Sequence, residues 1–542
     1  MIATPTSRAS NPHAVPTFPP RPLRRRLTAA AVALALLCPA LPPPAWAQNQ
    51  LPALGDPSGD DFSIATEHKL GAEIMREIRA DPDYLDDPVL LEYLQSIWQP
   101  LVAQARVRGN LSADIDQRLA WEPFLVRDKE VNAFALPGGF VGVNLGLLAL
   151  TSTRDELASV LAHEMSHITQ RHIARSIGNA RRQSLLSLAG MLAGLVVASK
   201  SGSSSVDAAQ AAVVGSQALA VQGQLNFSRD MEREADRVGW QVMTGAGFSP
   251  GGMAAMFEKM DLSSRLNDFG GYPYLRSHPL TSERIGEARA RMGPAAPAAA
   301  LGSPLSVLEH TAAQARARVL MDARFDALRR WQALDGDRVA TGVADKLLNA
   351  YSSALASTLL RDWARADASI AVAQGLVRGN ARAERAVALL NVQSLLGRGD
   401  VTRASAALAP YQADASRPVL LLATQATLAV AAARAPDDAA LKQRAEQLRT
   451  WVATHAGDAL AWTALGQVEE RLGEPLRAVR ADAESRVALG DLSGAADRLQ
   501  AGQRRARSGG AVDFIDVSVI DARLRDVEAQ LRQQKADEKA LR

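Results

Sequence analysis

The periodicity of apolar residues predicts two helices in the first half of the chain. Across residues 151–175 apolar positions recur at helical spacing, and Thr153-x-x-Glu156 has the form of a capping box at a helix N-terminus. The apolar stripe consists of Leu157, Val160, Leu161 and Ile168. These apolar residues predict a largely buried helix from Thr151 to Arg175, in which unpaired polar side chains would be costly. A second helical pattern covers residues 231–239.

Residues 131–143 carry a clear strand pattern. Val131 to Phe134 reads as a strand that ends at the turn Leu136-Pro137-Gly138-Gly139, and apolar residues resume from Phe140 to Val143. An edge strand here could bind an extended peptide by β-augmentation, whereas an ordinary core hairpin would give the same pattern. Because the other patterns are helical, the sequence predicts a mainly α fold with a small β-sheet.

A repeated helical pattern fills residues 305–510, which are rich in Ala, Leu and Arg. Trp462-x-x-Leu465-Gly466 resembles the start of a tetratricopeptide (TPR) helix pair, whose period is 34 residues. The residues that recur at this period are Ala461 with Ala495 and Leu465 with Leu499, and the predicted turns are Gly399-Asp400 and Gly490-Asp491. The pattern predicts a TPR-like α-solenoid, and a generic antiparallel helical bundle is the alternative.

The N-terminal 47 residues have the features of an export signal. Arg24-Arg25-Arg26 precedes an apolar run from Leu27 to Leu41, and Ala45-Trp46-Ala47 is an A-x-A cleavage pattern. The run of about 15 apolar residues is shorter than the roughly 20 that a transmembrane helix needs. Cys38, the single cysteine of the chain, lies in this segment. We therefore expect the mature chain to hold no disulfide and to use no catalytic thiolate.

The distribution of charge argues against nucleic-acid binding. The net charge is +3, but residues 1–47 carry five arginines and no acid, so the rest of the chain is mildly acidic. Hydrophobic residues make up 47% of the chain, which is enough to bury a core and excludes wholesale disorder.

A Pro/Ala/Gly-rich stretch divides the mature chain into two parts. The predicted segments are a signal peptide at 1–47, a first domain at 48–292, a linker at 293–304, helical repeats at 305–510 and an amphipathic helix or tail at 511–542. Within the first domain, residues 185–198 are apolar and uncharged. We interpret them as a buried or plugging helix, with peripheral contact to a membrane surface as the alternative.

The motif His163-Glu164-Met165-Ser166-His167 lies in the first predicted helix. Residues four positions apart are only about 40° apart on a helix, so both imidazoles leave one face and can bind one small cation, for which Zn²⁺ is well suited. Glu164, about 100° away, would reach a water molecule at the metal, as in zinc-dependent peptide hydrolases. Two solvated histidines are the alternative. His172 lies about 140° round the helix from His167 and is predicted to be a surface residue.

A zinc site with three protein ligands needs a further ligand from an element that packs across this helix. Glu232 and Asp236 share a face of the second helical pattern, whereas Glu234 points roughly 160° away, toward solvent. We assign Glu232 as the third ligand and Asp236 as a partner that fixes a ligand histidine. Ordinary surface ion pairs with neighbouring arginines would explain the same spacing, and the segment taken alone favours them.

Three motifs together resemble the HtpX and CAAX-prenyl-protease family of gluzincin zinc metallopeptidases. They are His163-Glu164-Met165-Ser166-His167, Glu232-Arg233-Glu234-Ala235-Asp236 and Asn132-Ala133-Phe134-Ala135-Leu136-Pro137-Gly138-Gly139. The export signal, the lack of clear membrane spans and the C-terminal repeats resemble the periplasmic branch of this family, the beta-barrel assembly-enhancing (BepA) type. The resemblance covers about residues 60–292 and, more loosely, the repeats.

The resemblance implies a gluzincin metalloprotease domain with one Zn²⁺ per chain. The implied ligands are His163, His167 and Glu232. Glu164 would be the catalytic base, and the family sometimes credits the residue at the position of Asp236 with proton donation.

His278-Pro279 and Arg284 match a second motif of the same family. In relatives of the BepA type, the corresponding histidine can occupy the fourth zinc site and hold the enzyme shut. Alternatively, His278 or Arg284 would stabilise the oxyanion of the reaction. An ordinary turn histidine before proline is the third interpretation of His278.

The resemblance further implies a periplasmic endopeptidase that cleaves misfolded or misassembled envelope and outer-membrane proteins. Its expected partners are unfolded substrates and, through the TPR repeats, the outer-membrane protein assembly machinery. A non-catalytic periplasmic chaperone or scaffold, which uses the repeats while the zinc site is held shut, is the alternative. The presence of all three ligands and of the base favours the enzyme.

Overall fold

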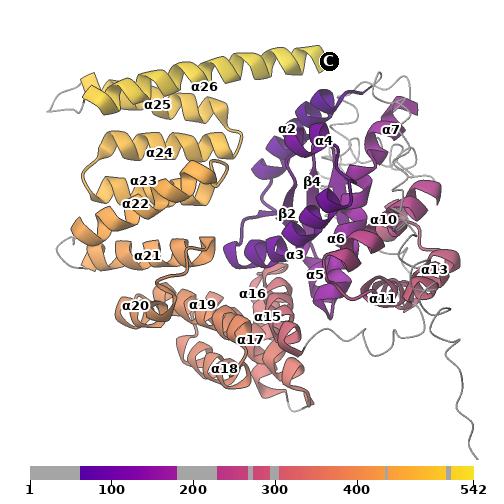
Figure 1. The fold of residues 1–542 in the computed structure, drawn as a ribbon. Coiled ribbons are helices and arrows are strands. Elements are labelled where there is room, and N and C mark those ends of the chain that lie inside the picture. Colours follow the sequence, from indigo (N-terminus) through magenta and orange to yellow (C-terminus); the bar gives the residue numbers. More distant parts are fainter. Residues whose placement is uncertain are drawn as a thin grey trace, which may run out of the picture. The chain divides into compact units, whose positions relative to one another are not determined.

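The fold is mainly helical with one small sheet, as the sequence predicts (Figure 1). The computed structural model describes residues 62–179, 229–266, 273–292, 304–337, 339–433, 438–507 and 514–541. The predicted signal peptide 1–47, the apolar segment 185–198 and nearly all of the predicted linker 293–304 lie outside these ranges. Among the described helices, none combines the length and the apolar character that crossing a membrane requires.

The elements up to Met292 include all four strands of the sheet. In chain order they are α2 (Ile64–Ala80), β1 (Tyr84–Leu85), α3 (Pro88–Val107), α4 (Ala113–Arg118), β2 (Glu122–Val126), β3 (Ala133–Leu136), β4 (Phe140–Asn144), α5 (Leu145–Leu150), α6 (Arg154–Thr169), α7 (His172–Asn179), α10 (Arg229–Gly245), α11 (Gly252–Leu266), α12 (Pro273–Ser277) and α13 (Ser282–Met292).

The sheet has the order β1-β2-β4-β3, so β3 lies at an edge. β2 and β4 run parallel, whereas β3 pairs antiparallel with β4 in a register that sets Leu136 opposite Phe140. Gly138 and Gly139 form the turn between β3 and β4 with φ of +83° and +88°, a left-handed conformation that suits glycine. The predicted order of strand, turn and strand is confirmed, although β3 begins and ends two residues later than the predicted Val131 to Phe134 and includes Leu136, which was predicted in the turn. β3 is the edge strand that one of the two interpretations required.

Helix α6 begins as the sequence predicts and ends earlier. The hydroxyl of the N-cap residue Thr153 accepts a hydrogen bond from the Glu156 N–H, as in a capping box. The Glu156 carboxylate accepts its bond from the N–H of Ser152, one residue before the N-cap, rather than from Thr153 itself. Every residue of α6 after Arg154 is buried. The predicted continuation to Arg175 is wrong, because α6 ends at Thr169 and Arg171 adopts a left-handed φ of +52° before α7 starts.

The elements after residue 303 are helical throughout the described part of the chain. They are α15 (Pro304–Leu320), α16 (Phe325–Gln332), η1 (Ala333–Gly336), α17 (Val343–Leu359), α18 (Trp363–Leu376), α19 (Ala381–Gly397), α20 (Val401–Leu408), η2 (Ala409–Tyr411), α21 (Arg417–Ala433), α22 (Asp438–Thr454), α23 (Ala459–Arg471), α24 (Pro475–Ala488), α25 (Leu492–Arg507) and α26 (Phe514–Leu541).

Successive helices of this region stack on one another as a helical solenoid would (Figure 1). The residues predicted to be equivalent at a spacing of 34, Ala461 with Ala495 and Leu465 with Leu499, are buried at corresponding places in α23 and α25. The predicted turns are present, since Gly399 and Gly490 adopt φ of +80° and +82° between helices. The C-terminal amphipathic helix is α26, whose Ile520 and Val527 are buried.

Helix α15 shares its core with the elements that precede it. Ala313 and Ala317 lie in the same hydrophobic cluster as residues of α3, α5 and α6. The His310 ring lies 2.6 Å from the Tyr93 hydroxyl through Nδ1 and 2.9 Å from the Thr151 carbonyl through Nε2. Burial lowers the pKa of His310 to about 4, so the ring is neutral at physiological pH. The first helix after the predicted linker is therefore packed directly beside the start of α6.

Three arginines bind the acidic N-terminus of α3. Arg316 of α15 forms a buried bidentate pair with Asp87, at 2.7–2.8 Å, Arg385 of α19 pairs with Glu92, and Arg417 of α21 pairs with Asp86. Acidic side chains at a helix N-terminus also interact favourably with the helix dipole. These pairs connect three separate helices of this region, α15, α19 and α21, to the beginning of α3.

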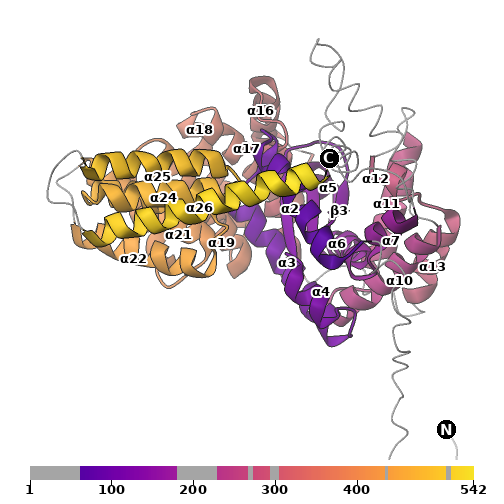
Figure 2. The same cartoon turned by 90° about the horizontal axis from the view of Figure 1, so that it is seen from above.

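The packing of α10 on α6 depends on Gly239. The two helices lie side by side in both views (Figure 1, Figure 2). A Cβ atom at Gly239 would lie 3.0 Å from the Ala162 carbonyl oxygen and the His163 nitrogen, closer than side chains normally approach backbone. The absence of a side chain at this position therefore sets the distance between the two helices that carry the candidate site.

We expect Gly239→Ala to lower the free energy of unfolding by about 1–3 kcal/mol, because the added methyl forces two backbones apart. Gly286→Ala is the matched control: Gly286 is a helical glycine of α13 with open space around it, and alanine there should raise stability by about 0.5–1 kcal/mol. Urea unfolding followed by circular dichroism measures both. Equal stability in the two variants would contradict the assigned role of Gly239.

Candidate metal centre

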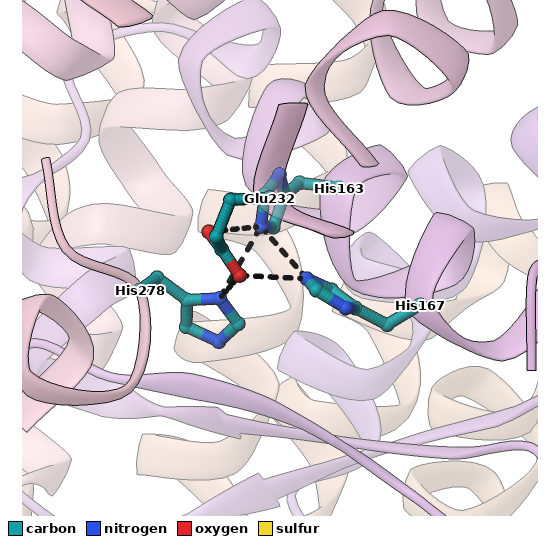
Figure 3. Close-up of side chains that lie close together, drawn as sticks. All are labelled: His163, His167, Glu232 and His278. Atoms are coloured by element: carbon teal, nitrogen blue, oxygen red, sulfur yellow. Dashed lines mark hydrogen bonds and ion pairs between the residues drawn. The ribbon is translucent and has the colours of Figure 1, made fainter. Parts of the chain in front are cut away.

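Four buried side chains converge between α6, α10 and the end of α12. His163 and His167 leave one face of α6, Glu232 comes from α10, and His278 follows α12 (Figure 3). One ligand atom from each lies within 4.8 Å of all the others. The structure thus brings together the three residues predicted as metal ligands and the histidine predicted to gate the site.

The distances between ligand atoms in this cluster suit an ion with tetrahedral coordination. His163 Nε2 lies 3.0 Å from His167 Nε2 and 3.3 Å from His278 Nδ1. The Glu232 carboxylate lies 3.4 Å from Nε2 of each α6 histidine and 3.0 Å from His278 Nδ1. Four ligands at about 2.0–2.1 Å from Zn²⁺ would be about 3.3 Å apart at the corners of a tetrahedron. The donor set, three imidazoles and a carboxylate, is also one that zinc prefers.

The charges around the cluster favour a bound cation. Although burial opposes it, the pKa of Glu232 is lowered by His278 and His163. Burial lowers the pKa of His163, but the carboxylates of Asp236 and Glu232 outweigh burial and raise it to about 10. Burial and the nearby His163 hold the pKa of His167 well below its usual value. Glu232 and His167 are therefore in the forms that bind metals, an ionised carboxylate and a neutral imidazole, whereas a metal would have to replace the proton of His163.

Asp236 and Arg284 support the ligands from one side. Asp236 Oδ1 lies 2.9 Å from His163 Nδ1, the ring nitrogen that faces away from the cluster. Arg284 of α13 donates to both oxygens of Asp236 at 2.7 and 2.9 Å, and its third nitrogen lies 2.9 Å from Glu232. Nη1 of Arg284 also donates to the Pro279 carbonyl at 2.9 Å. Because its three nitrogens are all engaged in this way, Arg284 is placed to fix Asp236 and Glu232 rather than to contact a reacting carbonyl.

Glu164 lies beside the cluster without joining it. Its Oε2 atom accepts a 3.0 Å hydrogen bond from the N–H of Ala135 on the edge strand β3. Its Oε1 atom is buried, lies 3.5 Å from His278 Nε2 and has no hydrogen-bond partner among the described residues. Burial raises the pKa of Glu164, which brings a carboxylate closer to the range that suits a general base.

Two expectations about neighbouring residues are wrong. His172, predicted to lie on the surface, is fully buried, and its Nδ1 lies 2.8 Å from Nδ1 of His167. Glu234, predicted to point toward solvent, is only 29% exposed and lies 3.0 Å from His172 Nε2. For His172, the left-handed Arg171 breaks the helix after His167, so the angle expected for a continuous helix does not apply. Glu234 does leave a different face of α10 from Glu232, but His172 and Arg175 of α7 cover that face instead of solvent.

Tyr274 is a site residue that the sequence analysis did not find. Its ring stacks on His278 with centroids 4.7 Å apart. Its hydroxyl is buried and makes no hydrogen bond with any described residue. The signal in the sequence was its position four residues before His278, one helical turn away, but the loop-like residues around it concealed that helix.

Part of the chain is similar to a known family of peptidases. The profile of peptidase family M48 matches residues 92–292. This part of the chain is an M48 peptidase domain. The family works with a divalent metal, and the four converging residues lie in the M48 domain.

Curated relatives of the M48 domain include proteases from bacteria and yeast. The beta-barrel assembly-enhancing protease of Escherichia coli is 33% identical over 273 residues, which cover 50% of this chain and 53% of that protein. Its counterpart from Yersinia pestis is 35% identical over 45% and 48% of the two chains. The mitochondrial metalloendopeptidase OMA1 of Schizosaccharomyces pombe is 36% identical over 42% and 61%. The chain thus spans about half the length of the bacterial relatives it matches.

We expect Arg284→Met to destabilise the M48 domain by about 3–5 kcal/mol, because it leaves two buried carboxylates without their cation. Arg289→Met, on the same helix, breaks a half-exposed pair with Glu258 and should cost under about 1 kcal/mol. Thermal unfolding of the metal-free proteins measures both values. Similar losses in the two variants would contradict a supporting role for Arg284.

Proposed function

We propose that this chain is a zinc-dependent endopeptidase of the bacterial periplasm. The observation that carries the proposal is the convergence of His163, His167 and Glu232 with the buried carboxylate of Glu164 beside them. The M48 domain supports peptide-bond hydrolysis as the reaction. One Zn²⁺ per chain would be held by the two α6 histidines and Glu232.

Zinc bound there would supply an activated water molecule and polarise the scissile carbonyl. Glu164 takes the proton from the attacking water at Oε1, because Oε2 is held by the Ala135 N–H, and returns it to the leaving amine. Asp236 orients the ring of His163 and is itself fixed by Arg284, so a positioning role suits it better than proton donation. The edge strand β3 is placed to bind an extended peptide next to Glu164.

His278 gives the site a closed state. Its Nδ1 atom lies 3.3 Å from His163 Nε2 and 3.0 Å from Glu232, in the position where a fourth ligand would exclude water. We propose that His278 locks the protease and must leave before substrate can bind. The same contact favours the second candidate function, a chaperone or scaffold that uses the helical repeats while the site stays shut.

The substrates that we propose are misfolded or misassembled outer-membrane proteins. Two of the relatives above carry beta-barrel assembly in their names. The stacked helices from α15 onward supply a TPR-like surface for the assembly machinery, and Arg316, Arg385 and Arg417 tie that region to α3 of the M48 domain. The leader at residues 1–47 supports export to the periplasm.

Substitutions at α6 separate metal binding from catalysis. We expect His163→Ala or His167→Ala to lose zinc, because each removes one of three ligands. Glu164→Gln should keep zinc and lower casein hydrolysis by about 100- to 10,000-fold, since an amide cannot accept the proton. Zinc is measured by metal analysis of purified protein, with the exposed Glu258→Gln as control for the assay. Full zinc retention in both histidine variants would refute the metal assignment.

Substitution of His278 distinguishes a lock from a catalyst. As a lock, His278→Ala should raise basal casein cleavage several-fold, because the fourth position becomes accessible to water and substrate. As an oxyanion donor, the same change should lower kcat by about 100-fold or more. The exposed His455→Ala serves as control, since that ring stacks on Trp451 in the repeats. A fall in activity would overturn the lock, and unchanged activity would leave His278 a turn residue.

A further inference from the structure

A chain of side chains leads from His167 away from the candidate metal centre. His167 turns Nε2 toward the cluster, and its other ring nitrogen, Nδ1, lies 2.8 Å from Nδ1 of His172. His172 Nε2 lies 3.0 Å from Glu234 Oε2, and the same oxygen accepts a 3.0 Å hydrogen bond from Arg175. We refer to His172, Glu234 and Arg175 as the relay.

Counting hydrogens fixes the direction of each contact in the relay. A neutral His167 that offers its Nε2 lone pair to a metal must carry its hydrogen on Nδ1. His172 Nδ1 must then accept that hydrogen, so a neutral His172 carries its own hydrogen on Nε2. That hydrogen is donated to Glu234, a carboxylate that only accepts when ionised. The negative charge of Glu234, held by Arg175, therefore determines the tautomer of both rings.

His172 cannot be an additional metal ligand in this arrangement. Its contact is with the Nδ1 side of the His167 ring, whereas the cluster forms on the Nε2 side. Its own Nε2 faces Glu234 of α10. His172 thus lies behind His167, on the side of the ring that faces away from the cluster. Asp236 lies in the same way behind His163, with Oδ1 2.9 Å from the Nδ1 atom of that ring.

The fold builds the relay at a backbone position that is unfavourable for most residues. Arg171 adopts a left-handed φ of +52°, which ends α6 and turns His172 back under His167. The Arg171 side chain is buried and donates a 2.7 Å hydrogen bond to the Phe62 carbonyl, with Glu67 at 3.4 Å. Strained backbone that is held by its surroundings is found preferentially at functional sites.

We propose that His172 and Glu234 are positioning residues that fix the tautomer and the ring orientation of the metal ligand His167. This inference rests on the proposed zinc site and adds to it two residues outside the motifs that define it. Partners behind ligand histidines typically change metal affinity by about 10- to 100-fold when they are removed.

The affinity for Zn²⁺ alone, measured by competition with a chromophoric chelator, tests the proposal. We expect His172→Phe, which keeps a ring of similar size without nitrogens, and Glu234→Ala each to weaken zinc binding by about 10- to 100-fold. Glu234→Gln should weaken zinc binding less, because the amide oxygen of glutamine can still accept a hydrogen bond from His172. Asp230→Asn is the matched control: it changes an exposed carboxylate of the same helix that pairs with Arg233 and should leave the affinity unchanged.

The double variant His172→Phe/Glu234→Ala distinguishes a relay from two separate effects. Since Glu234 acts on His167 only through His172, the double variant should bind zinc no more weakly than His172→Phe alone. The visible absorption bands of Co²⁺-substituted protein should shift in His172→Phe and not in Asp230→Asn, because they report the ligand field at the metal.

The outcomes separate this inference from the proposed function. Absence of zinc binding in the unsubstituted protein would refute the zinc site itself. Tight binding in that protein with unchanged affinity in His172→Phe would overturn the relay and leave the site intact, and additive losses in the double variant would overturn it also. Circular dichroism checks folding, and if His172→Phe does not fold, the part-exposed Glu234→Ala and Glu234→Gln decide.

Discussion

The close contact between α6 and α10 is the constraint on which the rest of the site depends. Because Gly239 has no side chain, the backbone of α10 approaches Ala162 and His163. Asp236 and Glu232 lie about one and two turns before Gly239 on the same helix. Both carboxylates then lie 2.9–3.4 Å from ring nitrogens of the α6 histidines. Neither helix carries a metal site alone, since each presents only part of the ligand set.

This contact concentrates charge in the interior, and the surrounding elements compensate for it. Glu164, Glu232 and Asp236 are all buried, which would be costly if they lacked partners. Arg284 from α13 neutralises two of them, and the edge-strand N–H of Ala135 bonds to the third. Behind the histidines, Asp236 lies against Nδ1 of His163 and His172 lies against Nδ1 of His167. Negative charge remains in the cluster after Arg284 is counted, and a divalent cation or a protonated histidine would neutralise it.

The helical repeats are linked to this site through structure rather than through sequence proximity. His310 and Gln314 of α15 bind the Thr151 carbonyl, two residues before the N-cap of α6. The bidentate Arg316–Asp87 pair secures the same helix to α3. Helix α15 is thus bonded directly to the residues that precede the helix carrying His163 and His167.

Local rules applied to the sequence determined much of the site. The spacing of His163 and His167 places both rings on one helix face, and Thr153 and Glu156 set where that helix begins. Gly138-Gly139 sets the turn beside β3. Each of these features depends only on neighbours in the chain.

Tertiary structure decided the rest of the site. The left-handed Arg171 is held by Phe62 and Glu67, about 100 residues away, and only that long-range packing turns His172 inward. The positions of His278, Tyr274 and Arg284 likewise depend on where α12 and α13 pack. The periodicity of the sequence does not determine that packing.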